Sequence, residues 1–261
     1  MRDFHVHSTY SDGVSTPEEI VLAAIDRSMD AIGFSDHSYT DFDLSYCMTK
    51  EKSQLYFEEI TALKKKYAGR INIFCGIEQD FYSHPPAQPY DYVIGSVHYI
   101  KLGEEYVPID CSPDYLIKAA DKYFDGDIYC IVEQYYKTVA KLLDKTNADI
   151  IGHFDLITKF NRNGNLFDES AERYRRAASE ALTALLKYDV PFEVNMGAIS
   201  RGYRERPYPA AEWIETIKAG GGRFIFSSDC HDKDYLRYQF DRYEKEYFAE
   251  GFRHQSQPMN K

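Results

Sequence analysis

Short apolar or alternating runs recur along the chain, separated by longer segments with helical spacing of apolar residues. A run of four to eight residues between turn signals is typical of a strand. The pattern predicts seven strands, at residues 2–7, 31–35, 71–77, 92–96, 149–152, 190–194 and 224–228. It predicts helices that start near Thr16 and cover about 51–67, 127–145, 169–188, 209–219 and 234–249.

Strands that alternate with helical segments indicate a parallel sheet or a barrel. Polar residues follow nearly every predicted strand, and barrels build their active sites at the carboxyl ends of their strands. A doubly wound open sheet would instead collect ligands mainly at one switch point. The sequence therefore predicts an α/β protein with a distorted seven-stranded (β/α)7 barrel of the TIM-like type. No Pro-rich or Ser/Gly-rich linker interrupts it, so we expect one domain over residues 1–261.

The composition limits the classes of binding partner and the cellular location that we expect. The formal net charge of −11 disfavours a nucleic-acid backbone as the main partner, although a phosphorylated small molecule remains compatible with a locally positive metal site. No apolar stretch approaches the roughly 18 residues of a membrane span, and the first residues are not an apolar signal segment. The five cysteines are odd in number and lack C-x-x-C spacing, which favours reduced thiols. We expect a cytoplasmic protein.

The first chemical signal is His5-Val6-His7. Side chains alternate along a strand, so the two imidazoles would share one face and form half of a transition-metal site. The alternative is a pair of polar residues at a strand edge. The metal-site interpretation is favoured only if the ends of other strands place further ligands near His5 and His7.

They do. Six of the eight histidines and three carboxylates fall at predicted strand ends: His5, His7, Asp12, His37, Glu78, His98, His153, Asp229 and His231. A single histidine at such a position is more often a capping or core residue. Burying nine ionisable groups together would be costly without compensation, whereas metal ions make the arrangement favourable. Mixed imidazole and carboxylate ligands favour Zn, Fe or Mn, and nine ligands imply two or three divalent ions.

These motifs resemble the polymerase and histidinol phosphatase (PHP) family. The motifs are H-x-H-S-x-x-S-D-G at 5–13, S-D-H at 35–37, G-I-E at 76–78, S-V-H at 96–98, G-H-F-D at 152–155 and S-D-C-H at 228–231. The resemblance implies a trinuclear centre. His5, His7, Glu78 and Asp229 would hold one ion; Glu78 would bridge to a second held with His98 and His153; Asp12, His37 and His231 would hold the third.

Three further stretches, at 90–98, 157–162 and 195–202, are similar to the histidinol-phosphate phosphatase branch. That branch implies hydrolysis of L-histidinol phosphate by metal-activated hydroxide. It implies a catalytic set of Glu78, Asp229 and His231. The expected substrate-binding residues are Arg162, Arg201, Asn195 and Ser96. The two arginines would fork onto phosphoryl oxygens, the alternative for each being a surface salt bridge.

Three other functions remain open: a PHP phosphoesterase for a nucleotide or sugar phosphate, a polymerase-associated DNA-editing accessory, and a metal-binding module without catalysis. For histidinol phosphate, residues 99–126 are expected to shape the pocket around the amine and imidazole. Six carboxylates in that region could pair with the ammonium: Glu104, Glu105, Asp110, Asp114, Asp121 and Asp125.

Overall fold

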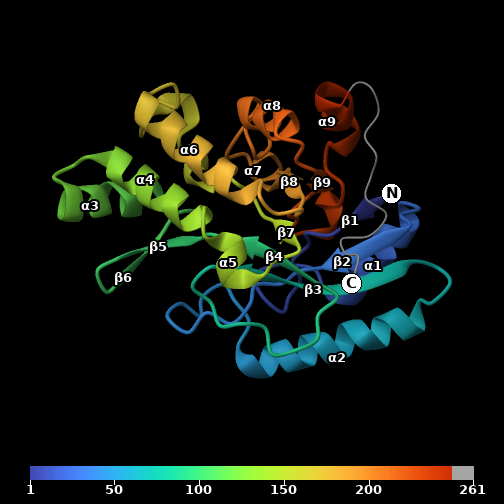
Figure 1. Ribbon diagram of the computed structural model, residues 1–261. Helices are drawn as coiled ribbons and strands as arrows, with labels where there is room; N and C mark the ends of the chain where they lie inside the picture. The colour runs from blue at the N-terminus through green and yellow to red at the C-terminus, as the bar shows by residue number, and fades with distance from the viewer. Residues whose placement is uncertain (249–261) are drawn as a thin grey trace.

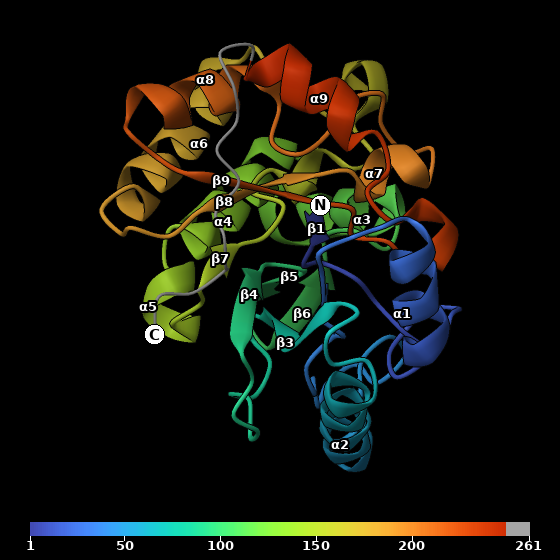
Figure 2. The same cartoon turned by 90° about the vertical axis from the view of Figure 1, so that its right-hand side faces the viewer.

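The computed structural model describes residues 1–248. Within them, seven parallel strands form one sheet whose order follows the chain. In that order the strands are β1 (Arg2–Asp3), β2 (Ala31–Phe34), β3 (Asn72–Asp80), β4 (Tyr92–Ser96), β7 (Ile150–Ile151), β8 (Phe192–Asn195) and β9 (Phe224–Ser227). Helices lie on opposite sides of the strands, with α6, α8 and α9 on one side and α2 on the other (Figures 1 and 2).

The two edges of this sheet meet. Val6, beyond β1, forms a parallel bridge with Cys230, beyond β9, and the main-chain N–H of His7 donates to the Cys230 carbonyl at 2.9 Å. The first and last strands are therefore neighbours, and the sheet is a nearly closed barrel. The predicted seven-stranded α/β barrel is confirmed.

Two strand predictions need correction. The first strand was expected over 2–7, but β1 ends at Asp3. Beyond it the Val6 N–H donates to the Ser35 hydroxyl at 3.0 Å, where a regular ladder would use a main-chain carbonyl. The third strand was expected to end at residue 77, but β3 continues to Asp80, which pairs with Ser96 of β4. Glu78 is thus held inside a strand.

The described helices are α1 (Pro17–Asp26), α2 (Lys50–Lys66), α3 (Pro113–Phe124), α4 (Ile128–Val139), α5 (Leu142–Thr146), α6 (Glu172–Leu185), α7 (Gly197–Ser200), α8 (Ala211–Ala219) and α9 (Phe240–Tyr247). At the start of α1, Thr16 and Glu19 form a capping box, as the Thr-Pro-Glu-Glu start indicates. None of the helices in residues 1–248 is long and apolar enough to cross a membrane.

Three helix predictions were too long. The helix expected at 169–188 covers only Glu172–Leu185 as α6. The helix expected at 127–145 is divided into α4 and α5 at residues 140–141, where Lys141 has φ −104° and ψ 4°, outside the helical range. The helix expected at 234–249 begins only at Phe240, because Lys233–Tyr235 form a separate 3₁₀ turn and Gln239 has φ +56°. Residue 249 and the polar tail lie outside the described residues.

Residues 99–126 are more ordered than the sequence suggested. They contain an antiparallel hairpin, β5 (Tyr99–Leu102) and β6 (Glu105–Pro108), followed by α3. Gly103 at the hairpin turn has φ +61°, a conformation that glycine adopts without strain. The hairpin projects from the carboxyl end of β4 beside the barrel mouth (Figure 1).

Below the polar strand ends, the barrel holds an apolar cluster built from β1, β2, β4, β7 and β9 and their flanking residues. Its largest member is Tyr92, whose hydroxyl donates to the Phe4 carbonyl at 2.6 Å and the Phe34 carbonyl at 3.0 Å. Gly76 leaves room for this ring, because a Cβ there would lie 2.3 Å from it. This packed layer forms a rigid floor beneath the polar residues.

Candidate metal centre

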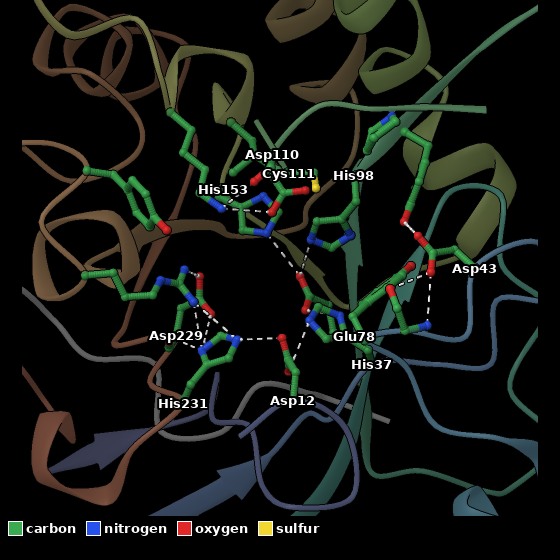
Figure 3. A pocket seen from close by; sticks show the side chains of 18 of the residues that line it. Asp12, His37, Asp43, Glu78, His98, Asp110, Cys111, His153, Asp229 and His231 are labelled. Carbon is green, nitrogen blue, oxygen red and sulfur yellow. Dashed lines mark hydrogen bonds and ion pairs between the residues drawn. The ribbon is translucent and has the colours of Figure 1, made fainter. Parts of the chain in front are cut away.

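The barrel brings all nine predicted metal ligands together at the carboxyl ends of its strands. Figure 3 shows the ligands that line the cavity, which are Asp12, His37, Glu78, His98, His153, Asp229 and His231. His5, His7 and Asp12 follow β1, and His37 follows β2. Glu78 lies in β3, while the remaining four follow β4, β7 and β9: His98, His153, Asp229 and His231. His5 and Glu78 are at most 1% exposed, so these two side chains lie within the protein rather than on its surface.

Glu78 occupies the middle of the cluster. Its two carboxylate oxygens face five imidazoles: Oε2 lies 3.3 Å from His5 Nε2, 3.5 Å from His7 Nε2 and 3.0 Å from His37 Nδ1, and Oε1 lies 3.5 Å from His98 Nε2 and 3.1 Å from His153 Nε2. Burial opposes ionisation of Glu78, but the neighbouring imidazoles, His5 first, hold the pKa of its carboxyl well below its usual range. A carboxylate in this position can bridge two cations.

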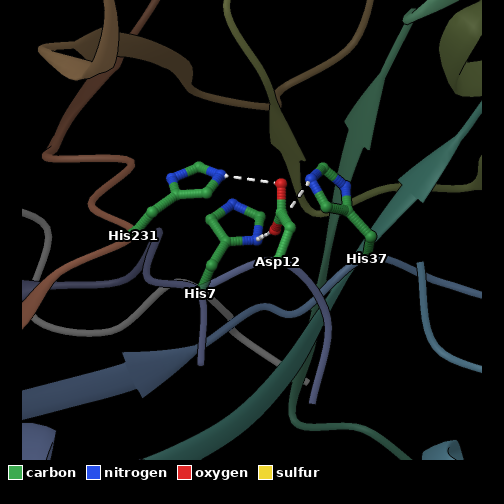
Figure 4. Close-up of side chains that lie close together, drawn as sticks. All are labelled: His7, Asp12, His37 and His231. Atoms are coloured by element: carbon green, nitrogen blue, oxygen red, sulfur yellow. Dashed lines mark hydrogen bonds and ion pairs between the residues drawn. The ribbon is translucent and has the colours of Figure 1, made fainter. Parts of the chain in front are cut away.

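A second group surrounds Asp12 (Figure 4). The Asp12 carboxylate lies 3.1 Å from His231 Nε2, 3.7 Å from His37 Nε2 and 3.6 Å from His7 Nδ1. Burial, followed by the charges of His231 and His37, lowers the pKa of His7 to about 3. His7 therefore stays neutral, and a neutral imidazole is the form that binds a metal ion.

The residues form three groups, and within each group the potential ligand atoms lie within 4.8 Å of one another. The groups are His5, His7 and Asp229; His7, Asp12, His37 and His231; and His37, Glu78 and His98. The first two correspond to two of the ion sites implied by the resemblance. In the third set His37 joins Glu78 and His98, whereas His153 approaches the same Glu78 oxygen as His98.

Several of these atoms are buried without a hydrogen-bond partner in residues 1–248, namely His5 Nε2, both nitrogens of His7 and Glu78 Oε2. Buried polar atoms normally have partners, so four orphaned atoms at one point need an explanation. Divalent cations supply it, because they would accept lone pairs from His5 Nε2, from Glu78 Oε2 and from one nitrogen of the neutral His7 ring. The residues fit a metal centre, and we conclude that this cluster binds metal.

The serines of the motifs hold the ligand-bearing loops. The fully buried Asp36 accepts hydrogen bonds from the main-chain N–H and hydroxyl groups of Ser8 and Ser11, at 2.7–3.0 Å. The loop that presents Asp12 is thereby fixed to the loop that presents His37. Residues of the sequence motifs, Ser8, Ser11 and Asp36, therefore fix the relative positions of the two ligand-bearing loops.

Of the predicted substrate-binding residues, Arg201 reaches the cluster. Its guanidinium donates to His231 Nδ1 at 2.8 Å and to Asp229 Oδ2 at 3.2 Å, and it lines the cavity. Ser96 and Asn195 are instead buried beside the ligands. Ser96 donates to Glu78 Oε1 at 2.5 Å, and Asn195 donates to Asp229 Oδ2 at 3.3 Å. Their side chains orient the metal ligands and do not line the cavity.

Arg162 is not among the residues that line the cavity. Its side chain is 60% exposed and pairs with Glu205 at 2.8 Å, because the chain makes 3₁₀ turns after β7 that direct it away from the site. Lys159, three residues earlier, lines the cavity instead. Its ammonium bonds to the carbonyl and the carboxylate of Asp110, at 2.8 Å and 3.1 Å.

The cavity above the ligands has a volume of about 440 Å³ (Figure 3). Residues 99–126 contribute Tyr99, Pro108, Asp110, Cys111 and Tyr115 to the cavity wall. Of the six candidate carboxylates in that region, Asp110 lines the cavity. A second carboxylate, Asp43, comes from the loop before α2 and was not predicted.

Two further buried carboxylates were not predicted from the sequence. Asp80 accepts from the His98 main-chain N–H at 2.7 Å, and Glu193 lies 2.6 Å from His5 Nδ1. A signal was available: each is two residues from a residue already singled out on the same strand, Glu78 or Asn195, and residues two apart share a strand face.

A model of the PHP domain matches residues 3–197, which is most of the chain. The chain belongs to the PHP family. The resemblance inferred from the motifs is thus confirmed, and seven of the nine cluster residues, all except Asp229 and His231, lie within the matched residues.

Curated relatives of this PHP protein cover nearly its whole length. A Deinococcus radiodurans protein named "Probable histidinol-phosphatase" is 27% identical over 91% of this chain and 89% of its own. The histidinol-phosphatase of Bacillus subtilis is 25% identical over 93% of this chain and 97% of its own. A crystal structure of Lactococcus lactis histidinol phosphate phosphatase, complexed with zinc, L-histidinol and phosphate, matches with a TM-score of 0.73. It is 20% identical and covers 97% of this chain and 94% of that chain, so the fold is shared.

Proposed function

We propose that this protein is a metal-dependent phosphomonoesterase that hydrolyses L-histidinol phosphate to L-histidinol and phosphate. The observation that carries the proposal is the cluster of six histidines and three carboxylates at the base of a cavity with two cationic side chains in its wall. The relatives named histidinol-phosphatase, and the L-histidinol and phosphate bound in the Lactococcus lactis structure, support the substrate. The enzyme would act as one PHP-type domain, in the histidine pathway and in the cytoplasm.

Three ions would be held as the family pattern implies. The first set is His5, His7, Glu78 and Asp229; the second is Glu78, His98 and His153; the third is Asp12, His37 and His231. When bound, divalent ions supply Lewis acidity and make hydroxide available from water near neutral pH. Zn, Fe and Mn all suit this donor set.

The charge of the site suits a phosphomonoester. Three divalent ions would bring six positive charges and Arg201 one more, and five nearby carboxylates return five, leaving about two positive charges. Asp12, Glu78 and Asp229 were counted from the sequence; the other two are the buried Asp80 and Glu193. A phosphomonoester of charge about −2 balances this field.

Arg201 and Lys159 would bind the phosphoryl group from two sides. The Arg201 guanidinium already stands 2.8 Å from His231, so its planar N–H groups can reach oxygens of a phosphate at the ligand cluster. Lys159 lines the same cavity and carries a compact positive charge, which the contacts with Asp110 hold in place. Both residues would hold the transferring group in place while its negative charge redistributes.

Asp43 is the best-placed partner for the cationic part of the leaving group. Its carboxylate accepts hydrogen bonds from Tyr99 Oη at 2.7 Å and from the N–H and hydroxyl of Ser45, which are all neutral donors. Asp110, in contrast, is already neutralised by Lys159. Tyr46 and Tyr99 add aromatic surface beside Asp43, suitable for an imidazole ring.

We therefore expect Asp43→Asn to raise KM for L-histidinol phosphate about tenfold to a hundredfold, the cost of one charge-assisted hydrogen bond. Turnover of p-nitrophenyl phosphate, which has no ammonium group, should hardly change. Steady-state kinetics with both substrates check this. Asp114→Asn, an exposed position on α3, is the matched control and should leave both substrates unaffected.

Metal removal tests the proposed chemistry. Phosphate release from L-histidinol phosphate should stop after prolonged dialysis against a chelator, and return when Mn, Fe or Zn is added back. Colorimetric phosphate assays with parallel elemental analysis measure this. Full activity in a preparation free of metal would exclude the proposed mechanism.

A further inference from the structure

A buried carboxylate lies behind the metal ligands. Glu193 belongs to β8, is 1% exposed and does not line the cavity, so it has no direct route to a substrate. A buried carboxylate is costly unless its oxygens find strong partners. Each of its two oxygens is engaged, and the partners all lead to the metal centre.

One oxygen contacts His5. Glu193 Oε1 lies 2.6 Å from His5 Nδ1, a short, charge-assisted distance. An ionised carboxylate only accepts hydrogen bonds, so Nδ1 must carry the proton. In the neutral ring that binds a metal ion, the lone pair of His5 is then on Nε2, the atom that is buried without a hydrogen-bond partner and lies 3.3 Å from Glu78 Oε2.

The other oxygen joins two more ligands. Glu193 Oε2 accepts from the main-chain N–H of His153 at 3.1 Å and from the Asn195 side-chain amide at 3.0 Å. The same amide reaches Asp229 Oδ2 at 3.3 Å. One carboxylate therefore connects ligand positions that follow β1, β7 and β9.

We propose that Glu193 is a positioning residue for the metal centre, which fixes His5 as an Nε2 ligand and holds His153 and Asp229 in register with it. A carboxylate behind a metal-bound histidine sets the tautomer and ring orientation and raises the basicity of the ligand. The proposal rests on the metal centre described above. Glu193 acts on that centre through His5 and does not touch the substrate.

The substitution Glu193→Gln separates this role from packing. Glutamine has nearly the same volume, but its single carbonyl oxygen cannot accept from His5 Nδ1 on one side and from His153 and Asn195 on the other. The NH₂ group of the glutamine must then point towards N–H donors, either that of His5 or those of His153 and Asn195. Glu193→Asp keeps the charge with a shorter reach. Asp91→Asn is a matched control, because Asp91 accepts from the Cys75 N–H at 2.6 Å near the amino end of β4, away from the centre.

The experiment is competition between the metal-loaded protein and a chromophoric chelator for Zn²⁺, with the absorption spectrum of the Co²⁺-loaded protein as a second readout. We expect Glu193→Gln to weaken one class of ion about tenfold to a hundredfold and to change the Co²⁺ spectrum. Glu193→Asp should fall between Gln and wild type. Asp91→Asn should lower the unfolding midpoint and leave Zn²⁺ affinity and the spectrum unchanged.

Unchanged Zn²⁺ affinity in Glu193→Gln, with a lower unfolding midpoint of the metal-free protein, would overturn the proposal and leave Glu193 a structural carboxylate. If the Gln variant does not fold, unchanged affinity in Glu193→Asp overturns it equally. In a His5→Ala background the Gln substitution should cost much less than in wild type; an undiminished loss also counts against it. A wild-type protein that binds no divalent ion would instead refute the metal centre itself.

Discussion

Glu78→Gln should remove at least two metal ions and lower kcat/KM by about three to five orders of magnitude, corresponding to the several kcal/mol that metal ions contribute to such a reaction. The reason is the position of Glu78: both oxygens stand within 3.5 Å of imidazoles that belong to different predicted ion sites. The neutral amide keeps the shape but loses the charge that holds two cations together. Elemental analysis and phosphate-release kinetics measure the two effects.

Glu59→Gln is a suitable control for this substitution. Glu59 lies on α2, accepts from the Tyr10 hydroxyl at 2.6 Å and is not in the cluster, so metal content and kinetics should match wild type. Wild-type protein supplied with metal should hold two to three equivalents. One equivalent or none, or a Glu78→Gln variant that keeps all its ions, would contradict the bridging role.

Arg201→Ala should lower kcat/KM about a hundredfold to a thousandfold, as expected for removing a donor that stabilises charge on a transferring group. Arg201 is the predicted arginine that the barrel brings to the ligands, through His231 and Asp229. Arg201→Lys should recover only part of the loss, because a single ammonium cannot form the paired hydrogen bonds of a guanidinium.

Arg162→Ala serves as the paired comparison. The side chain is 60% exposed and its partner is Glu205, so we expect a change of less than about twofold. Kinetics of both variants with L-histidinol phosphate decide the matter. A large loss in Arg162→Ala with none in Arg201→Ala would mean that the structure assigns the phosphate contact to the wrong arginine.

The ligand cluster could be predicted because it depends on strand ends alone. In a parallel barrel the carboxyl ends of all strands lie at one rim, so His37 after β2 and His153 after β7 share that rim, and both reach Glu78. Small errors in strand bounds did not matter. β1 is four residues shorter than expected, yet His5 and His7 still lie together, with ring centroids 5.1 Å apart.

The cavity wall could not be predicted in the same way, because it comes from loops whose conformation depends on tertiary contacts. Arg162 and Lys159 are three residues apart in one connection, and only the 3₁₀ turns after β7 decide which of them faces the site. Asp43 reaches the cavity from the loop before α2, and no spacing rule links that loop to residues 99–126. Glu193 is different, since its two-residue distance from Asn195 on β8 was a signal in the sequence itself.

We propose that the cavity selects L-histidinol phosphate over other phosphomonoesters. This selectivity is measured as kcat/KM of the metal-loaded protein for L-histidinol phosphate, p-nitrophenyl phosphate, a nucleoside monophosphate and a sugar phosphate under one set of conditions. We predict that L-histidinol phosphate exceeds the others by about two orders of magnitude or more, because the competitors leave Asp43 without its cationic partner. Equal or faster turnover of the nucleotide or the sugar phosphate would contradict the assignment.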